Sequence, residues 1–363
     1  MMTNMLATLR LVLALTILNA GAITAAEPSP APVPAAMDSI RFFGRWDLRT
    51  PNHSITVNSG SYLVARFSGP AITARFDISL NNGPFPTVTW RIDNGEWQES
   101  EVWTQRKLAE GLAAGPHTLC LMVRGIDEHQ SRWKAPLVGS VHFLGLEFPN
   151  GGKLLPPLAE WEHPKLKMEF LGDSITEGVV VQELRDGKTT WSWLSDALDS
   201  YPSRTALQLG AAWRQVGFGA AGLAHKGSGG ALGALDTFNF FYEGCPRDDW
   251  QPDVVVINHG TNDATMPSEK YRPLYAQYLA LIRQGYPHAK IVALRPFNGA
   301  QAEGIKQEVE LARAAGDNAV YYIDTTDWYS GPLHPNAKAC VEIANKLVDA
   351  LKTQVIAPGL KAP

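Results

Sequence analysis

The sequence has few cysteines: Cys120, Cys245 and Cys340 are the three among 363 residues. Their spacing matches no common metal-binding motif, which argues against a cysteine-based metal centre. Cys120 lies in an apolar run typical of a strand, and Cys340 lies on a face with helical periodicity. We therefore expect buried free thiols at both positions, although an exported chain could pair two of the three. The sequence predicts no cofactor and no metal ion.

An excess of charge of one sign is also missing. The chain has 32 Lys and Arg residues against 36 Asp and Glu residues, a net charge of −4. A balance of this kind argues against a surface for nucleic acid or for an anionic membrane. Beyond the N-terminal segment, no run is apolar enough over a sufficient length to cross a bilayer. We therefore expect neither nucleic-acid binding nor stable membrane insertion.

The N-terminus has the pattern of a secretory signal peptide. Arg10 precedes an apolar run over 11–18, and small residues ending at Ala26 provide a cleavage site. We predict a signal peptide over 1–26, followed by a Pro/Ala-rich linker over 27–37. This arrangement predicts a secreted or periplasmic protein, with an uncleaved anchor as the alternative.

Residues 38–152 have the pattern of a β-structure. Short runs of alternating polar and apolar residues, such as 61–67, 71–77 and 87–93, are separated by turn sequences rich in Gly, Pro and Asn. About seven short strands and no convincing helix are expected. This pattern predicts a β-sandwich domain, of the jelly-roll type.

The pattern changes over residues 153–363. Uniformly apolar short runs alternate with helical periodicity, as expected for parallel strands that are buried on both faces. The predicted strands are 168–171, 215–218, 254–258, 291–294 and 320–323, and the predicted helices are 274–284, 302–315 and 335–351. This order predicts a three-layer α/β domain.

Three polar motifs follow predicted strands of this domain. A Gly-Asp-Ser motif ending at Ser174 follows the first strand, a Gly-Thr-Asn-Asp motif containing Asn262 follows the third, and a His-Pro-Asn motif beginning at His334 comes after the last. Ligands bind at the carboxyl ends of the strands in open α/β sheets. We therefore expect these three side chains to meet at one edge of the sheet.

The three residue types suit acyl transfer. Ser174 would attack an ester carbonyl, with His334 as the general base that takes its proton. The resulting oxyanion needs hydrogen-bond donors. The backbone N–H of Ser174 and the side-chain amide of Asn262 are two candidates, and the turn at Gly219 and Ala220 offers a third.

These motifs resemble those of the SGNH, or GDSL-type, hydrolase superfamily. The resemblance rests on Phe-Leu-Gly-Asp-Ser-Ile-Thr-Glu-Gly at 170–178, Val-Ile-Asn-His-Gly-Thr-Asn-Asp at 256–263 and Leu-His-Pro-Asn at 333–336, and it covers about residues 167–352. It implies a flavodoxin-like three-layer fold and ester hydrolysis without a metal ion.

The preceding β-domain resembles that of carbohydrate esterase family 2. The similar segments are Phe-Gly-Arg at 43–45 and Gly-Pro-His-Thr-Leu at 115–119. This second resemblance implies removal of acetyl groups from plant polysaccharides such as xylan and glucomannan.

Two positions depart from the superfamily pattern. A glycine usually donates its N–H to the oxyanion where this chain has Ala220, which can serve if its φ is negative; Gly219 is the alternative. An aspartate usually lies two or three residues before the histidine, where this chain has Gly331 and Pro332. Asp327 could reach the imidazole instead, or a carbonyl near Pro332 could orient it. We favour the second arrangement, a Ser–His dyad.

Two further residues are candidates for contact with a sugar. Trp328 precedes the histidine in its loop and could stack on a sugar ring, whereas packing is the ordinary role of a tryptophan. His259, within the third motif, is either a substrate contact or a buried polar residue.

The sequence thus predicts an exported serine esterase that deacetylates O-acetylated plant polysaccharides or oligosaccharides. A general short-chain or lipid esterase on the same fold is the closest alternative. A non-catalytic carbohydrate-binding protein is a third possibility, suggested by the missing acid. The presence of Ser174, Asn262 and His334 argues against this last reading.

Overall fold

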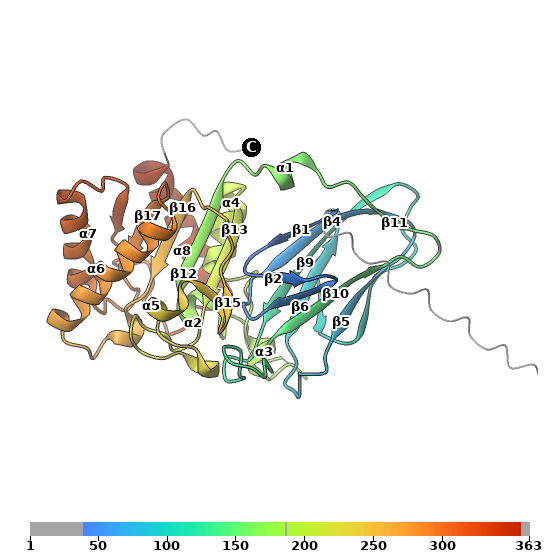
Figure 1. The fold of residues 1–363 in the computed structure, drawn as a ribbon, viewed down its shortest axis with the longest axis horizontal. Coiled ribbons are helices and arrows are strands. Elements are labelled where there is room, and N and C mark those ends of the chain that lie inside the picture. The colour runs from blue at the N-terminus through green and yellow to red at the C-terminus, as the bar shows by residue number, and fades with distance from the viewer. Residues whose placement is uncertain (1–38, 186, 357–363) are drawn as a thin grey trace, which may run out of the picture. The chain divides into compact units, whose positions relative to one another are not determined.

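The computed structural model describes residues 39–185 and 187–356 (Figure 1). The predicted signal peptide (1–26) and linker (27–37) lie outside the described residues. Within those two ranges, every helix is too short or too polar to cross a bilayer.

The N-terminal part consists of two antiparallel β-sheets. The first has the order β1 (Ile40–Phe43), β4 (Tyr62–Ser68), β9 (Pro116–Gly125), β6 (Thr87–Ile92) and β7 (Gln98–Glu101), with β11 (Lys153–Leu155) also paired to β4. The second has the order β2 (Asp47–Thr50), β3 (His53–Thr56), β10 (Val141–Glu147), β5 (Ile72–Asp77) and β8 (Gln105–Ala109). The β-rich prediction is confirmed, with more strands than expected because edge strands such as β7 are short and polar.

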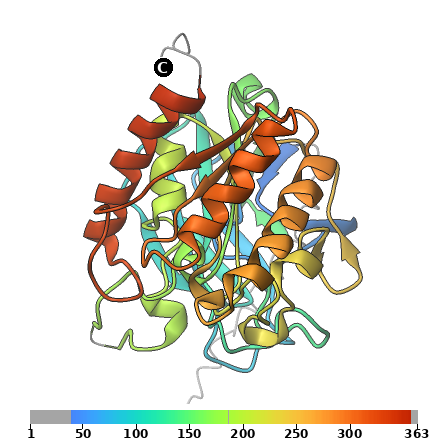
Figure 2. The same cartoon turned by 90° about the vertical axis from the view of Figure 1, so that its left-hand side faces the viewer.

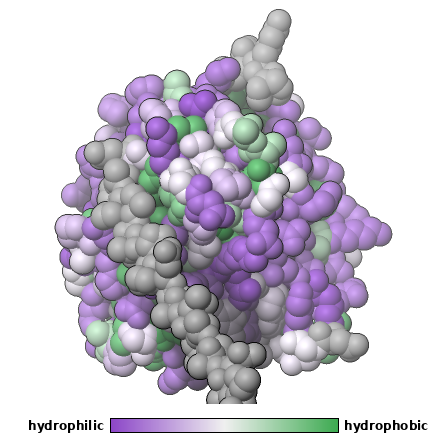
Figure 3. All heavy atoms as spheres, turned by 90° about the vertical axis from the view of Figure 1, so that its right-hand side faces the viewer, coloured by the Kyte–Doolittle hydropathy of each residue, from purple (hydrophilic) through white to green (hydrophobic). Residues whose placement is uncertain are grey.

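The two sheets pack face to face around one apolar core. Leu121 of β9, in the first sheet, and Phe143 of β10, in the second, belong to the same buried cluster. Alternate residues of β5 point into this core, as expected for a sheet with one face buried. The first sheet continues to Leu155, three residues past the predicted boundary at 152. Figure 3 shows the face of the molecule on which the β-rich part lies, and its surface is mostly hydrophilic.

The C-terminal part is built on a parallel sheet. Its strands are β12 (Lys167–Gly172), β13 (Ala212–Gly217), β16 (Val254–Asn258), β17 (Lys290–Leu294) and β18 (Val320–Ile323). Their order in the sheet is β13-β12-β16-β17-β18, so the second strand in the sequence lies outside the first. This is the flavodoxin-like order, which confirms the predicted α/β fold.

Helices cover both faces of the parallel sheet. The long ones are α4 (Tyr201–Leu209), α6 (Ser268–Gly285), α7 (Ala302–Ala314) and α8 (Ala337–Ala350). Helices α4 and α8 pack together on one face, and α6 and α7 pack on the other (Figure 2). Helix α4 was not predicted, and α6 begins six residues before the predicted start at 274. Pro273 therefore lies inside α6, past its first turn, and its missing N–H costs the helix one internal hydrogen bond.

Short elements connect these layers. They are α1 (Ala159–Glu162), α2 (Ser174–Glu177), α3 (Trp191–Leu194), α5 (Ala234–Thr237), the hairpin β14 (Phe240–Tyr242) with β15 (Cys245–Pro246), and the 3₁₀ turns Ser228–Gly230 and Thr261–Asp263. A short π-helix at Leu351–Val355 follows α8 directly. All three cysteines are free thiols; Cys245 and Cys340 are buried, and Cys120 is half-buried.

Arginines of the β-rich part are buried against the α/β part. Arg45 is 1% exposed and forms an ion pair with Glu169 of β12 at 3.3 Å. Arg124, at the end of β9, donates hydrogen bonds to the carbonyl oxygens of Trp193 and Ser195, both at 3.0 Å. A buried guanidinium must be paired or hydrogen-bonded, so each of these side chains holds the two parts in a defined contact.

Candidate active site

Ser174 lies at the carboxyl end of β12, as the first residue of the short helix α2. Asp173 caps this helix, and its Oδ1 accepts the N–H of Ile175 at 3.0 Å. A side chain on Gly172 would place its Cβ 2.1 Å from Oγ1 of Thr176, which explains the glycine at that position. The strand and the tight turn after it therefore fix the position of the serine.

His334 reaches Ser174 from the loop between β18 and α8. Its Nε2 lies 2.9 Å from Oγ of Ser174. Asn336 begins α8 by accepting the N–H of Ala339 at its Oδ1, 3.0 Å away, and this cap fixes where the loop ends. Burial lowers the pKa of His334 below its ordinary value. The imidazole is therefore neutral near pH 7, as a general base must be.

Neither candidate for orienting His334 is hydrogen-bonded to it in the described part of the chain. Asp327 is exposed, and its backbone oxygen accepts a bond from Lys346 at 3.0 Å. The carbonyl oxygen of Pro332 accepts the hydroxyl of Tyr329 at 2.6 Å. Among the described residues, the hydrogen-bond partner of the imidazole is the hydroxyl group of Ser174.

Asn262 lies beside the serine loop, in the 3₁₀ turn that follows β16. Its Nδ2 donates to Oδ2 of Asp173 and to the carbonyl oxygen of Ala221, both at 3.1 Å. Burial raises the pKa of Asp173 to about 7. Asp263 accepts the N–H of Leu223 at 2.7 Å, so both aspartates bond loop backbone. The amide of Asn262 must release one of its two bonds in order to bind an oxyanion.

Gly219 and Ala220 form the middle of a tight turn. The N–H of Ala221 donates to the carbonyl oxygen of Phe218 at 3.1 Å, and Ala220 has a φ of 58°. The negative φ that we required of Ala220 is therefore absent, because a turn of type II needs a positive φ at its third residue. The N–H of Gly219 is engaged by Oε2 of Glu177 at 3.1 Å. The N–H of Ala220 has no acceptor among the described residues.

An ion pair between the two parts of the chain supports this turn. Arg132, from the loop after β9, contacts both carboxylate oxygens of Glu177, at 2.5 Å and 2.7 Å. The two side chains are 0% and 1% exposed. Because Glu177 belongs to the helix of Ser174 and also bonds Gly219, the pair ties the β-rich part to the serine and the turn at once. The sequence carries no signal for this pair: Glu177 lies in the motif at 170–178, but no pattern around Arg132 marks it as the partner.

A second carboxylate from the β-rich part lies against the same turn. A Cβ on Gly219 would fall 1.4 Å from Oε2 of Glu128, so the carboxyl group occupies the space that a side chain would need. Burial and the charge of Glu177 raise the pKa of Glu128. Sequence reasoning missed this residue as well.

The two candidates for sugar contact lie in different surroundings. His259 is 3% exposed and lines a small internal cavity, and burial lowers its pKa to about 4. Its position is that of a buried polar residue. Trp328 is half-buried and lines a cavity of about 450 Å³ together with His334.

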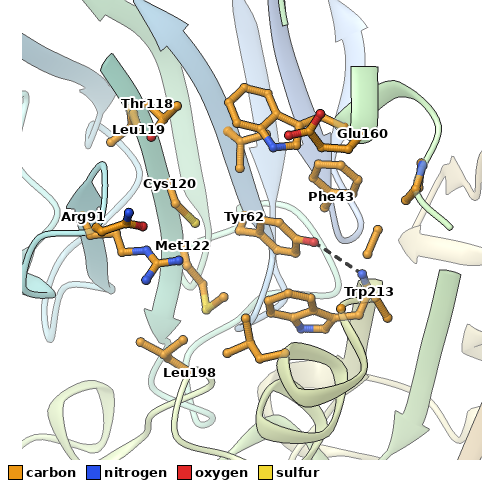
Figure 4. A pocket seen from close by; sticks show the side chains of 18 of the residues that line it. Phe43, Tyr62, Arg91, Thr118, Leu119, Cys120, Met122, Glu160, Leu198 and Trp213 are labelled. Carbon is orange, nitrogen blue, oxygen red and sulfur yellow. Dashed lines mark hydrogen bonds between the residues drawn. The ribbon is translucent and has the colours of Figure 1, made fainter. Parts of the chain in front are cut away.

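A cavity of similar size lies at the opposite end of the parallel sheet. Its volume is about 460 Å³, and aromatic side chains from both parts of the chain, including Phe43, Tyr62 and Trp213, surround it (Figure 4). The N–H of Trp213, near the beginning of β13, donates to the hydroxyl of Tyr62 at 3.4 Å. This cavity is therefore at the amino ends of the strands, away from Ser174.

Known protein families match both parts of the chain. Residues 170–340 match the GDSL-like lipase/acylhydrolase family, and residues 42–157 match the carbohydrate esterase 2 N-terminal domain. The chain joins these two domains and is an esterase. No curated protein matches the sequence.

Solved structures share the two-domain fold. A family two carbohydrate esterase from Clostridium thermocellum, solved in complex with cellohexaose, is 27% identical, with 87% of this chain and 98% of that chain covered and a TM-score of 0.73. A family two carbohydrate esterase from Cellvibrio japonicus is 21% identical, with coverage of 87% and 95% and a TM-score of 0.73. The acetyl xylan esterase Est2A from Butyrivibrio proteoclasticus is 20% identical, with coverage of 87% and 96% and a TM-score of 0.67.

Proposed function

We propose that this chain is an exported carbohydrate esterase that removes acetyl groups from O-acetylated polysaccharides of the xylan or glucomannan type. The observation that carries the proposal is the 2.9 Å contact between Oγ of Ser174 and Nε2 of His334. It occurs in a chain whose first domain matches the N-terminal domain of carbohydrate esterase family 2. Two of the similar structures are described as binding cellohexaose or as an acetyl xylan esterase.

The first half of the reaction forms an acetyl-enzyme. Oγ of Ser174 attacks the acetyl carbonyl carbon while Nε2 of His334 takes the hydroxyl proton. When the tetrahedral intermediate collapses, the bond between the carbonyl carbon and the sugar oxygen breaks. The imidazolium of His334 returns the proton to that oxygen, and the sugar leaves with a free hydroxyl group.

The second half releases acetate by the same route. Water attacks the acetyl carbonyl, and His334 takes one of its protons. The bond to Oγ then breaks, and the proton passes to Ser174. No metal ion or cofactor is needed for either half.

Three donors are proposed for the oxyanion. The backbone N–H groups of Ser174 and Ala220 lack acceptors among the described residues, which leaves them available. Although the φ of Ala220 is positive, its N–H is still unbonded, so we keep it as a donor and drop the condition of a negative φ. The amide of Asn262 would be the third, after it exchanges its bond to Asp173 for one to the oxyanion. Donors held in place by the surrounding fold stabilise the developing charge without reorganising, which is their advantage over water.

We propose that His334 works without a triad acid. The absence of a hydrogen bond between Asp327 and the imidazole within the described ranges supports a Ser–His dyad. Trp328 is the proposed sugar contact, because it lines the same cavity as the histidine.

The test is acetate release by the purified protein. We expect release from acetylated xylan or glucomannan, hydrolysis of an aryl acetate, and loss of nearly all of both rates in Ser174→Ala. Ser79→Ala changes an exposed serine of the β-rich part; it is the matched control and should keep the wild-type rates. Activity that survives Ser174→Ala would overturn the mechanism. Faster hydrolysis of a lipid ester than of both polysaccharides would overturn the substrate class, and sugar binding without any hydrolysis would favour a binding protein.

A further inference from the structure

Two histidines and an aspartate meet on the outer face of the second β-sheet. His53 of β3, His142 of β10 and Asp77 of β5 each present a potential ligand atom, and these atoms all lie within 4.8 Å of one another. Strands β5 and β10 run side by side, with Asp77 directly opposite His142 (Figure 1). On β3 the residue opposite His142 is Ile55, so His53, two residues away, points to the same face.

The hydrogen bonds around His142 determine which of its nitrogens carries the proton. The hydroxyl of Ser140 donates to the carbonyl oxygen of Leu137 at 2.5 Å. It must therefore accept its second bond, at 2.8 Å, from Nε2–H of His142. The lone pair of the ring is then on Nδ1. This nitrogen faces Nε2 of His53 at 2.8 Å.

The surroundings suit a ligand set that is fixed on one side and open on the other. His142 is 5% exposed, whereas His53 and Asp77 are half-buried. The carboxylate of Asp77 accepts the backbone N–H of Ser79 at 2.8 Å, which holds it in place. Solvent can therefore reach the side of the cluster that faces away from His142.

We propose that His53, His142 and Asp77 bind a zinc ion, with water in the fourth position. Two imidazoles and one carboxylate are a ligand set that zinc accepts and that magnesium and calcium, which prefer oxygen, do not. Ligand atoms of a tetrahedral zinc ion lie about 3.3 Å apart, so a small rotation of the half-exposed His53 opens enough space.

The bond from His142 to Ser140 strengthens this assignment. Histidines that bind metals donate their other N–H to a polar group, which orients the ring and raises its basicity. Here the orienting group is present, and it belongs to the segment 137–140 that covers the buried histidine. The bound ion would join β3, β10 and β5, so we assign it a role in stabilising the β-rich part. The site is separate from Ser174 and independent of the proposed esterase function.

The experiment is a zinc titration of the full chain after treatment with a chelator. We expect about one zinc ion per chain by calorimetry and native mass spectrometry, a higher thermal midpoint with zinc than without, and a tetrahedral absorption spectrum with cobalt(II) as a probe. His53→Gln and Asp77→Asn should each lower the affinity at least about tenfold, and Ser140→Ala by about 10- to 100-fold. These two ligand variants are chosen because half-exposed positions tolerate substitution.

Controls separate this site from other histidines and from the esterase. His163→Gln removes an exposed histidine elsewhere and should leave zinc binding unchanged, and Ser174→Ala should bind zinc like the wild type. Absence of one-to-one zinc binding by the wild-type protein would overturn the proposal. Binding that is unchanged in both His53→Gln and Asp77→Asn would also overturn it, and would leave these side chains as a hydrogen-bonded pair beside a carboxylate.

Discussion

The two ends of the parallel sheet hold cavities of nearly equal volume whose linings differ in polarity. At the carboxyl ends, about 450 Å³ lies beside His334 and is lined mostly by polar side chains. At the amino ends, about 460 Å³ is lined by Phe43, Tyr62 and other aromatic side chains (Figure 4). Cavity volume therefore does not distinguish the two ends, whereas the contact between Ser174 and His334 occurs at the carboxyl ends alone among the described residues.

The β-rich part also contributes differently to the two ends. At the carboxyl ends it supplies charged groups, Glu128 and Arg132, which contact the turn and the helix around the serine. At the amino ends it supplies mainly apolar and aromatic side chains, together with the charged residues Arg91 and Asp93. Side chains of the first domain therefore help to hold the turn and the helix that position Ser174.

The largest expected effect comes from substituting one residue at each end of the sheet, which tests whether the reaction depends on the carboxyl end alone. His334→Ala should lower kcat/KM by more than about 1,000-fold, since it removes the base. Trp97 also lines the amino-end cavity, and Trp97→Ala should change kcat/KM by no more than about threefold. Kinetics on an aryl acetate and on acetylated xylan measure both. A large loss in Trp97→Ala on the polysaccharide alone would show that the amino end binds substrate.

The buried ion pair should matter most for stability. Arg132→Met leaves the carboxylate of Glu177 buried without a positive charge beside it and should reduce the free energy of unfolding by about 3–5 kcal/mol. Lys107→Met breaks the exposed pair with Glu110 and should cost about 1 kcal/mol or less. Denaturant unfolding compares the two. Equal losses of unfolding free energy in the two variants would mean that the Arg132–Glu177 pair stabilises the protein no more than an exposed ion pair does.

The contact between Glu128 and the turn can be tested by adding a methyl group at Gly219 and then shortening the side chain of Glu128. Gly219→Ala should displace the carboxyl group, shift the turn and lower kcat by about 100-fold. Adding Glu128→Ala should recover much of that loss, because it frees the space for the new methyl group. A double variant no better than Gly219→Ala alone would show that the loss has another cause.

The smallest effect is expected at Asp327. Asp327→Asn should keep kcat within about threefold of the wild type, because the side chain is exposed and does not bond the imidazole. Steady-state kinetics on an aryl acetate suffice for this comparison. A loss of about 10,000-fold, the size expected when a triad acid is removed, would replace the dyad with a triad.

Patterns that recur along the chain were predicted well. The five parallel strands were found because each contains a short, mostly apolar run, although β13 begins three residues earlier than expected. Arg214 and Gln215 interrupt its apolar pattern, yet both are buried: Arg214 pairs with Asp248, and Gln215 donates to the carbonyl oxygen of Thr176 at 2.7 Å. A buried polar residue that is satisfied by a distant partner looks like a surface residue to any local pattern.

The sequence by itself determined the two domain types and the motifs that hold Ser174, Asn262 and His334, because strand periodicity and short loop motifs are local properties. Only the tertiary structure decided the rest. It set the left-handed turn at Ala220, the missing contact to Asp327, and the charged groups that the first domain places beside the second. These depend on burial and on partners that are distant in sequence, where the cost of an unpaired charge selects the geometry.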